Sequence, residues 1–197
     1  MKEEADILVS NSRKLIYFAT SNEYKFNEAK NILANYEIDL KMVKGKINEI
    51  QDDSLRRIAV HALSKALDQG ERPTIIEDAG LFVKMLNGFP GPYSSYVYRM
   101  LGVNGILRLM NRMKNRDAEF RSVVVFGNKP SFIKTFQGVV KGKISLQPKG
   151  RSGFGFDPIF IPKGSKKTFG EMSLEEKNYL SHRARTFHKF AKWYISV

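Results

Sequence analysis

Apolar and polar positions in the first part of the chain form blocks that predict strands followed by helices. Residues 14–20 are a short apolar run typical of a strand, and residues 23–33 carry apolar side chains at helical spacing. A second strand is expected at 39–43. A second helix is expected after residues 52–54, whose polar side chains are typical N-caps, and it should continue to Gln69.

The second part of the chain mixes strands, helices and a hairpin. Thr74–Glu77 is predicted to be a buried strand that ends in acids, and Phe120–Gly127 and Phe132–Ile144 are strand-like runs separated by a turn. The other expected elements are a strand at 81–86, helices at 93–101 and 103–113, a short strand ending at Phe160, and a final helix beginning near Ser181. Early strand–helix alternation and a late hairpin predict an α/β fold with a mixed sheet.

Length and composition are those of a folded globular protein. The 197 residues, 42% of them hydrophobic, are enough for one domain with its own core. The absence of cysteine excludes disulfides and thiolate metal sites. No apolar segment approaches the roughly 20 residues of a membrane span, and residues 1–13 lack the pattern of a signal peptide. We therefore expect a cytoplasmic protein in which residues 14–197 form a single domain behind an N-terminal extension, 1–13.

The net charge of +13 points to an anionic partner. Nucleic acid is the common partner of a basic domain, and phosphorylated small molecules are the alternative. The charges are spread along the chain rather than gathered into one arm, which weakens the nucleic-acid interpretation.

Four segments carry residue types suited to phosphate chemistry. Thr20–Lys25 lies between a strand and a helix, where backbone N–H groups attract anions, although a simply capped helix would look the same. Glu77 and Asp78 could supply oxygen ligands to Mg²⁺, with Glu49 as a further carboxylate, unless they belong to an acidic turn.

The other two segments come late in the chain. Gly153–Phe160 places aromatic residues between glycines, so that an exposed ring could stack on a purine, the alternative being an aromatic turn buried in the core. The fourth segment contains Lys177 and then Ser181-His182-Arg183. With Ser181 as N-cap, His182 and Arg183 lie in the first turn of the last helix, where the helix dipole disfavours a cation. These cations either bind an anion or form a solvated face.

Together the four segments resemble the inosine triphosphate pyrophosphatase family, which hydrolyses non-canonical purine nucleoside triphosphates. The stretches that carry the resemblance, in order, are TSNEYK, EDAGL, GFPGPYS, GFGFDPIF and EMSLEEKNYLSHR. The resemblance covers about residues 14–193. It implies an elongated central mixed β-sheet with two α/β lobes around an active-site cleft, usually in a homodimer. It also implies Mg²⁺-dependent hydrolysis of inosine, deoxyinosine and xanthosine triphosphates to the monophosphate and pyrophosphate, with no membrane and no stable nucleic-acid partner.

The resemblance also implies roles for individual residues. Glu49 and Asp78 would hold the metal, and Asp78 would accept the proton. Substrate would be bound by residues of all four segments: Thr20, Ser21, Asn22, Glu23, Tyr24 and Lys25; Ala79; Phe154, Gly155, Phe156 and Asp157; and Lys177, His182 and Arg183.

Two positions depart from the family's pattern. Phe156 stands where tryptophan is more common, which leaves less area for stacking, and Ala79 stands where Ser or Thr is common, which removes a hydroxyl. The scheme requires Lys25, Asp78 and Arg183 to share one cavity. It also predicts that Asp78→Asn and Arg183→Ala each abolish most of the activity without disturbing the fold.

Overall fold

A computed structural model describes residues 13–44, 50–70 and 72–197. Its strands form one seven-stranded sheet in the order β2-β1-β3-β5-β6-β7, with β4 paired to β3. The strands are β1 (Lys14–Ala19), β2 (Ile38–Val43), β3 (Thr74–Val83), β4 (Pro90–Gly91), β5 (Asp117–Lys129), β6 (Phe132–Ile144) and β7 (Phe160–Pro162). β1 runs parallel to β2 and β3, whereas the other pairs are antiparallel. The predicted mixed sheet is confirmed.

Five α-helices and three short 3₁₀ turns accompany these strands in the described part of the chain. They are α1 (Glu23–Ala34), α2 (Leu55–Leu67), α3 (Ser94–Leu109), α4 (Leu174–Leu180) and α5 (His182–Ile195), with η1 (Lys84–Leu86), η2 (Asp157–Ile159) and η3 (Phe169–Glu171). Three predicted helix starts are confirmed by side-chain caps. Asn22, Ser54 and Ser181 each accept a hydrogen bond from the backbone N–H three residues further on.

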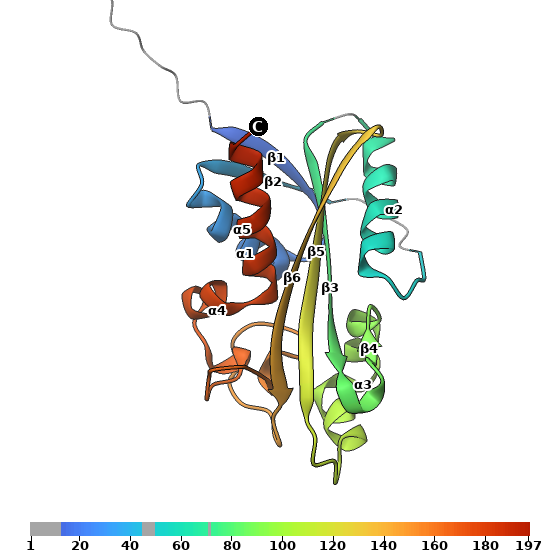
Figure 1. Cartoon of the computed structure of the whole chain (residues 1–197), viewed down its shortest axis with the longest axis vertical. Coiled ribbons are helices and arrows are strands. Elements are labelled where there is room, and N and C mark those ends of the chain that lie inside the picture. Colours follow the sequence, from blue (N-terminus) through green and yellow to red (C-terminus); the bar gives the residue numbers. More distant parts are fainter. Residues whose placement is uncertain (1–12, 45–49, 71) are drawn as a thin grey trace, which may run out of the picture.

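The helices divide into two lobes along the sheet. In the upper lobe, α1 and α5 cover one face and α2 covers the opposite face (Figure 1). In the lower lobe, α3 and the segment from Phe156 to Met172 enclose a separate core built on the other halves of β3, β5 and β6. The long strands β3, β5 and β6 pass through both lobes (Figure 1).

Several predicted boundaries were wrong in instructive ways. The two strands expected around residues 74–77 and 81–86 are one strand, β3, so the acids lie in its middle. The two helices expected at 93–101 and 103–113 are confirmed within α3 (Ser94–Leu109), where Gly102, with a φ of 60° and a ψ of −171°, separates them, but the second ends at Leu109 rather than at 113. Phe160 begins β7 rather than ending a strand, and the short helix α4 was not predicted.

The edge of β3 changes partners along its length, and this positions the site. β1 pairs with β3 as far as Phe18 and Ile75, and β4 joins the same edge at Leu81. Between these two points, and within the described residues, β3 is hydrogen-bonded to β5 on its other edge but to no strand on this edge. The stretch from Ile76 to Gly80 therefore lies at a gap in the sheet edge.

Candidate active site

A cavity of about 640 Å³ opens at this gap between the two lobes. It is lined by the end of β1, the middle of β3, the first turns of α1, α3 and α5, and the loop before η2. Because a helix N-terminus carries partial positive charge, the first turns of α1 and α5 make this cavity favourable for anions.

Most of the predicted site residues line the cavity, although they come from distant parts of the chain. Lys25, Asp78 and Arg183 are all among them, as the scheme required. The predicted residues that line it are Thr20, Ser21, Asn22, Tyr24, Lys25, Asp78, Ala79, Phe154, Gly155, Phe156, Asp157, His182 and Arg183.

Three predicted residues have a different status. Glu23 is not a lining residue, and its exposed carboxylate accepts a hydrogen bond from Lys44 at 3.2 Å. Lys177 is buried behind the lining residues rather than among them. Glu49, the expected second metal ligand, lies outside the described residues.

Glu77 and Asp78 do not form the paired carboxylate expected from their sequence. Successive strand residues point to opposite faces of a sheet, and Glu77 lies on the face that α5 covers, where it meets Arg183. Asp78 lies on the other face and is half-buried, with its Oδ1 accepting a hydrogen bond from the Ala79 N–H at 2.9 Å. The two carboxylates therefore have separate roles.

Glu77 is enclosed by hydrogen-bond donors and cations. Its carboxylate lies 3.0 Å from Lys25 Nζ and 3.2 Å from Arg183 Nε, and it accepts a hydrogen bond from Ser122 Oγ at 2.7 Å. Burial alone would raise the pKa of Glu77, but the charges of Arg183 and Lys25 and the Ser122 hydrogen bond lower it to about 2. Glu77 is thus an ionised, buried carboxylate at neutral pH and a weak proton acceptor.

Sequence reasoning missed Glu28, the acid at the centre of a buried charge network. Its carboxylate accepts a hydrogen bond from Lys177 Nζ at 2.6 Å and another from Arg183 Nη1. Burial would raise the pKa of Glu28, yet the neighbouring Arg183 and Lys177 charges hold it below its usual value. The available signal was a charged residue beside Ala29 on the apolar face of α1.

The network also explains the cations at the start of α5. Lys177 and Arg183 are 3% and 2% exposed, so a solvated basic face is excluded. Three cations (Lys25, Lys177, Arg183) face three acids (Glu28, Glu77, Asp157), and the six charges balance. These cations are therefore already paired before any ligand is bound.

The glycine-rich loop is held by the same network. Asp157 accepts hydrogen bonds from the Phe154 N–H at 2.8 Å and from Lys177 Nζ at 2.6 Å. Gly153 has a φ of 75°, and a Cβ there would lie 2.2 Å from Asp157 Oδ2, so the position requires glycine.

The two phenylalanines of this loop have different surroundings. Phe156 is 3% exposed and packs edge-on against Tyr98 in the lower core. Phe154 is half-buried and lies nearer to the charges, with Lys177 Nζ 4.9 Å from its ring centroid. For Phe156 the alternative of an aromatic turn buried in the core is therefore confirmed, and Phe154 is the more accessible of the two rings.

His182 is buried and neutral. Its ring stacks on Phe120 at 4.6 Å between centroids. Burial and then the charge of Arg183 lower the pKa of His182 well below its usual value. Within the described part of the chain its Nδ1 has no hydrogen-bond partner. A neutral imidazole at the cavity wall is suited to contact an uncharged polar group.

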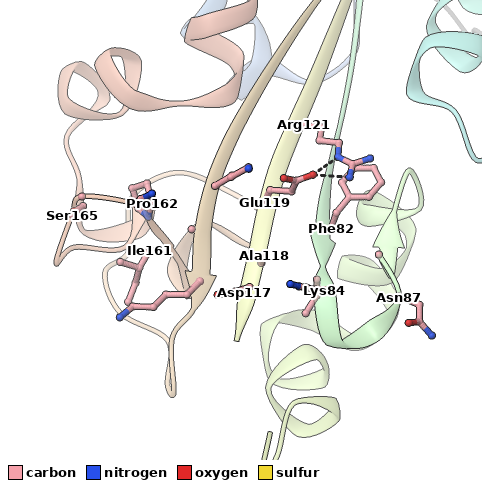
Figure 2. A pocket seen from close by; sticks show the side chains of 17 residues that line it. Phe82, Lys84, Asn87, Asp117, Ala118, Glu119, Arg121, Ile161, Pro162 and Ser165 are labelled. Atoms are coloured by element: carbon pink, nitrogen blue, oxygen red, sulfur yellow. Dashed lines mark hydrogen bonds and ion pairs between the residues drawn. The ribbon is translucent and has the colours of Figure 1, made fainter. Parts of the chain in front are cut away.

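A second, larger hollow of about 890 Å³ shares no lining residue with this cavity. It lies on the lower part of the sheet, where Glu119 and Arg121 form an ion pair beside Phe82 (Figure 2). Its cations are Lys84, Arg121, Lys141, Lys143 and Lys163. None of the predicted site residues lies there, so size alone does not locate the chemistry.

Comparison with known proteins agrees with this geometry. The model of the Ham1 family matches residues 16–193. The chain belongs to the Ham1 family. The match includes all five stretches that carried the resemblance to the non-canonical purine triphosphate pyrophosphatases, and that resemblance is confirmed.

Relatives within the Ham1 family span nearly the whole chain. A dITP/XTP pyrophosphatase of Methanopyrus kandleri is 46% identical over 91% of this chain and 95% of its own length. One from Saccharolobus solfataricus is 50% identical over 88% of this chain and 90% of its own length. The Ham1 protein of Staphylococcus aureus has the same fold, with a TM-score of 0.79, 26% identity, and coverage of 93% of this chain and 99% of that one.

None of the helices in the described residues is long and apolar enough to cross a membrane.

Proposed function

We propose that this chain hydrolyses deoxyinosine, inosine and xanthosine triphosphates to the monophosphate and pyrophosphate. The observation that carries the proposal is the single cavity in which Asp78 meets the first turns of α1 and α5. The 46% and 50% identical relatives named dITP/XTP pyrophosphatase support the choice of substrate.

The triphosphate would lie along the first turn of α1. Lys25, whose ammonium group is 3.0 Å from Glu77, is partly accessible from the cavity and can contact a phosphate without leaving its carboxylate. Backbone N–H groups at the starts of α1 and α5 add partial positive charge. Behind these N–H groups, the paired charges of Lys25, Lys177 and Arg183 with Glu28, Glu77 and Asp157 hold the three cations in place and sum to zero.

The reaction joins a water oxygen to the α-phosphorus and breaks the bond from that phosphorus to the bridging oxygen. Pyrophosphate leaves with the bridging oxygen, and the water gives up a proton. We assign acceptance of this proton, or orientation of the water, to Asp78, because Asp78 is half-buried at the wall of the cavity whereas Glu77 is buried against Lys25 and Arg183.

A magnesium ion fits the donor set at Asp78. Among the described residues no three carboxylates or imidazoles converge, and Mg²⁺ commonly uses only one or two carboxylates together with water and substrate phosphate. Asp78 would hold the ion, with Glu49 as the expected second ligand. When bound, Mg²⁺ neutralises charge on the attacked phosphate and on the leaving pyrophosphate.

Selectivity for the base would come from the cavity wall near His182. A hypoxanthine or xanthine offers a keto oxygen at the position where adenine has an amino group. A hydrogen-bond donor aimed at that oxygen leaves adenine mispaired, and such a mismatch can give about 10⁴-fold discrimination.

The test is pyrophosphate release measured with deoxyinosine, xanthosine, inosine, guanosine, adenosine and pyrimidine triphosphates, with Mg²⁺ and with a chelator. We expect the first three to be turned over fastest, adenosine triphosphate to be nearly inert, and the chelator to abolish turnover. If adenosine triphosphate were turned over as fast as deoxyinosine triphosphate, or if modified pyrimidine nucleotides were turned over faster, the site would be assigned to other nucleotides.

A basic nucleic-acid-binding module is the second candidate, and the cationic hollow of Figure 2 is the observation that favours it. Binding of a single-stranded oligonucleotide that is salt-sensitive and independent of Mg²⁺, in a chain without triphosphate turnover, would support that alternative. We expect no stable complex.

We further propose that residues 14–197 form one catalytic domain behind the extension 1–13, and that the protein acts as a cytoplasmic homodimer. Analytical ultracentrifugation of the full chain tests the dimer, and full turnover by a chain lacking residues 1–13 tests the domain division.

A further inference from the structure

Tyr24 and Phe154 form a stacked pair at the wall of the cavity. Their ring centroids are 5.3 Å apart and their planes differ by 22°. Tyr24 comes from the first turn of α1 and Phe154 from the glycine-rich loop, and both residues line the same cavity. The pair therefore joins the two lobes across the site.

The two members of the pair are held very differently. Phe154 is anchored by its N–H, which donates to Asp157 at 2.8 Å, and by cations 4.9 and 5.4 Å from its ring centroid. Tyr24 is 59% exposed, and Phe154 is its one ring contact within the described residues. Its backbone is fixed because Asn22 caps the turn through the Lys25 N–H. Rotation of the side chain alone can thus move the Tyr24 ring away from Phe154.

We propose that Tyr24 is a base-stacking residue: its ring moves off Phe154 and the purine base of the substrate enters between the two rings. The inference rests on the proposed function, and it changes the role of Tyr24 from phosphate binding to base binding. Aromatic side chains stack on bases because both present flat π-surfaces, and each stack contributes measurably to affinity. The Tyr24 ring covers the face of Phe154 on which the base would stack, and so shields that face from water.

The position of Tyr24 supports this role. It directly precedes Lys25, which points toward β3 and Glu77, so adjacent residues of one helical turn would contact the two ends of the nucleotide. Because a purine presents more stacking surface than a pyrimidine, Tyr24 would also favour purine substrates.

The test compares Tyr24→Ala and Tyr24→Phe with Tyr96→Ala, using the full chain. Tyr96 is a matched control, since it is 58% exposed and does not line the cavity. For Tyr24→Ala we expect KM for deoxyinosine triphosphate to rise about tenfold, as stacking on one ring permits, with kcat changed much less. Tyr24→Phe keeps the ring and should recover most of this loss.

Two further measurements separate base binding from other roles. The inhibition constant of inorganic pyrophosphate should not change in Tyr24→Ala, whereas the preference in kcat/KM for deoxyinosine over deoxyuridine triphosphate should fall. Provided that the wild type is active, two results would overturn the inference: an unchanged or lowered KM in Tyr24→Ala, or an inhibition constant of pyrophosphate that rises as much as KM. Absence of wild-type turnover would instead overturn the proposed function.

Discussion

Glu77 and Asp78 are neighbours in β3 whose side chains lie on opposite faces of the sheet. Glu77 is enclosed between Arg183 and Lys25, whereas Asp78 is half-buried at the wall of the cavity. Strand geometry alone produces this division, because consecutive side chains alternate. One carboxylate thus stabilises the arrangement of cations, and the other lies at the wall of the cavity.

Replacing each of these acids should have opposite consequences. Asp78→Asn is expected to lower pyrophosphate release from deoxyinosine triphosphate by at least about a hundredfold, as the loss of a proton-accepting group does. Its melting temperature should remain near that of the wild type.

Glu77→Gln is the matched variant at the adjacent position. It leaves Lys25 without its anion and Arg183 with Glu28 alone, and should lower the free energy of unfolding by about 3–5 kcal/mol. Urea unfolding and turnover, measured on both variants, test whether Glu77 acts on stability and Asp78 on the reaction. A stable, active Asp78→Asn would refute the assignment of Asp78.

Arg183→Ala should destabilise the protein, contrary to the expectation from sequence that the fold would survive unchanged. Arg183 is 2% exposed, and its removal leaves the buried Glu28 with Lys177 and the buried Glu77 with Lys25 as their remaining cations. We expect a loss of about 3–5 kcal/mol in the free energy of unfolding.

Arg185→Ala is the control for this prediction, since Arg185 lies on the same helix and is exposed, with Nη1 donating to the Val139 carbonyl at 3.0 Å. It should cost less than about 1 kcal/mol. Equal losses in the two variants would show that the buried network contributes little.

Replacing the two phenylalanines of the glycine-rich loop should affect different properties, stability for Phe156 and substrate binding for Phe154. Phe156→Ala removes a core side chain and is expected to lower the free energy of unfolding by about 3–5 kcal/mol. Phe154→Ala should instead raise KM for deoxyinosine triphosphate and leave the melting temperature within a few degrees. Thermal unfolding and KM are the measurements, and a reversed pattern would return the stacking role to Phe156.

Stability should rise with pH through the range in which an unfolded histidine titrates. The unfolded chain binds a proton at His182 near pH 6.5, whereas burial and Arg183 keep the folded imidazole neutral well below that pH. Below pH 6.5 the unfolded state therefore holds more protons, and each such group lowers stability by up to about 1.4 kcal/mol per pH unit as the pH falls.

Urea unfolding between pH 5 and 7.5 measures this slope. His182→Gln should show a shallower dependence on pH than the wild type. His188, a half-buried histidine whose pKa is also lowered, first by burial and then by Lys192, provides the comparison through His188→Gln. Identical slopes in the wild type and His182→Gln would contradict a neutral buried imidazole.

Local sequence determined most of the secondary structure and the family. Asn22, Ser54 and Ser181 cap the helices that their patterns predicted, because a capping side chain acts on a backbone N–H only three residues away. The ordered segments around Lys25 and Asp78 were likewise readable without a structure.

Only the tertiary structure decided how these residues are used. The alternation of a strand shows that Glu77 and Asp78 face opposite ways, but the packing of α5 determines which of them is buried. Glu28 pairs with Lys177 and Arg183, which lie 149 and 155 positions further along the chain, and no local pattern encodes such contacts. Caps and periodicity act between near neighbours, whereas burial and charge pairing depend on which distant elements the fold brings together.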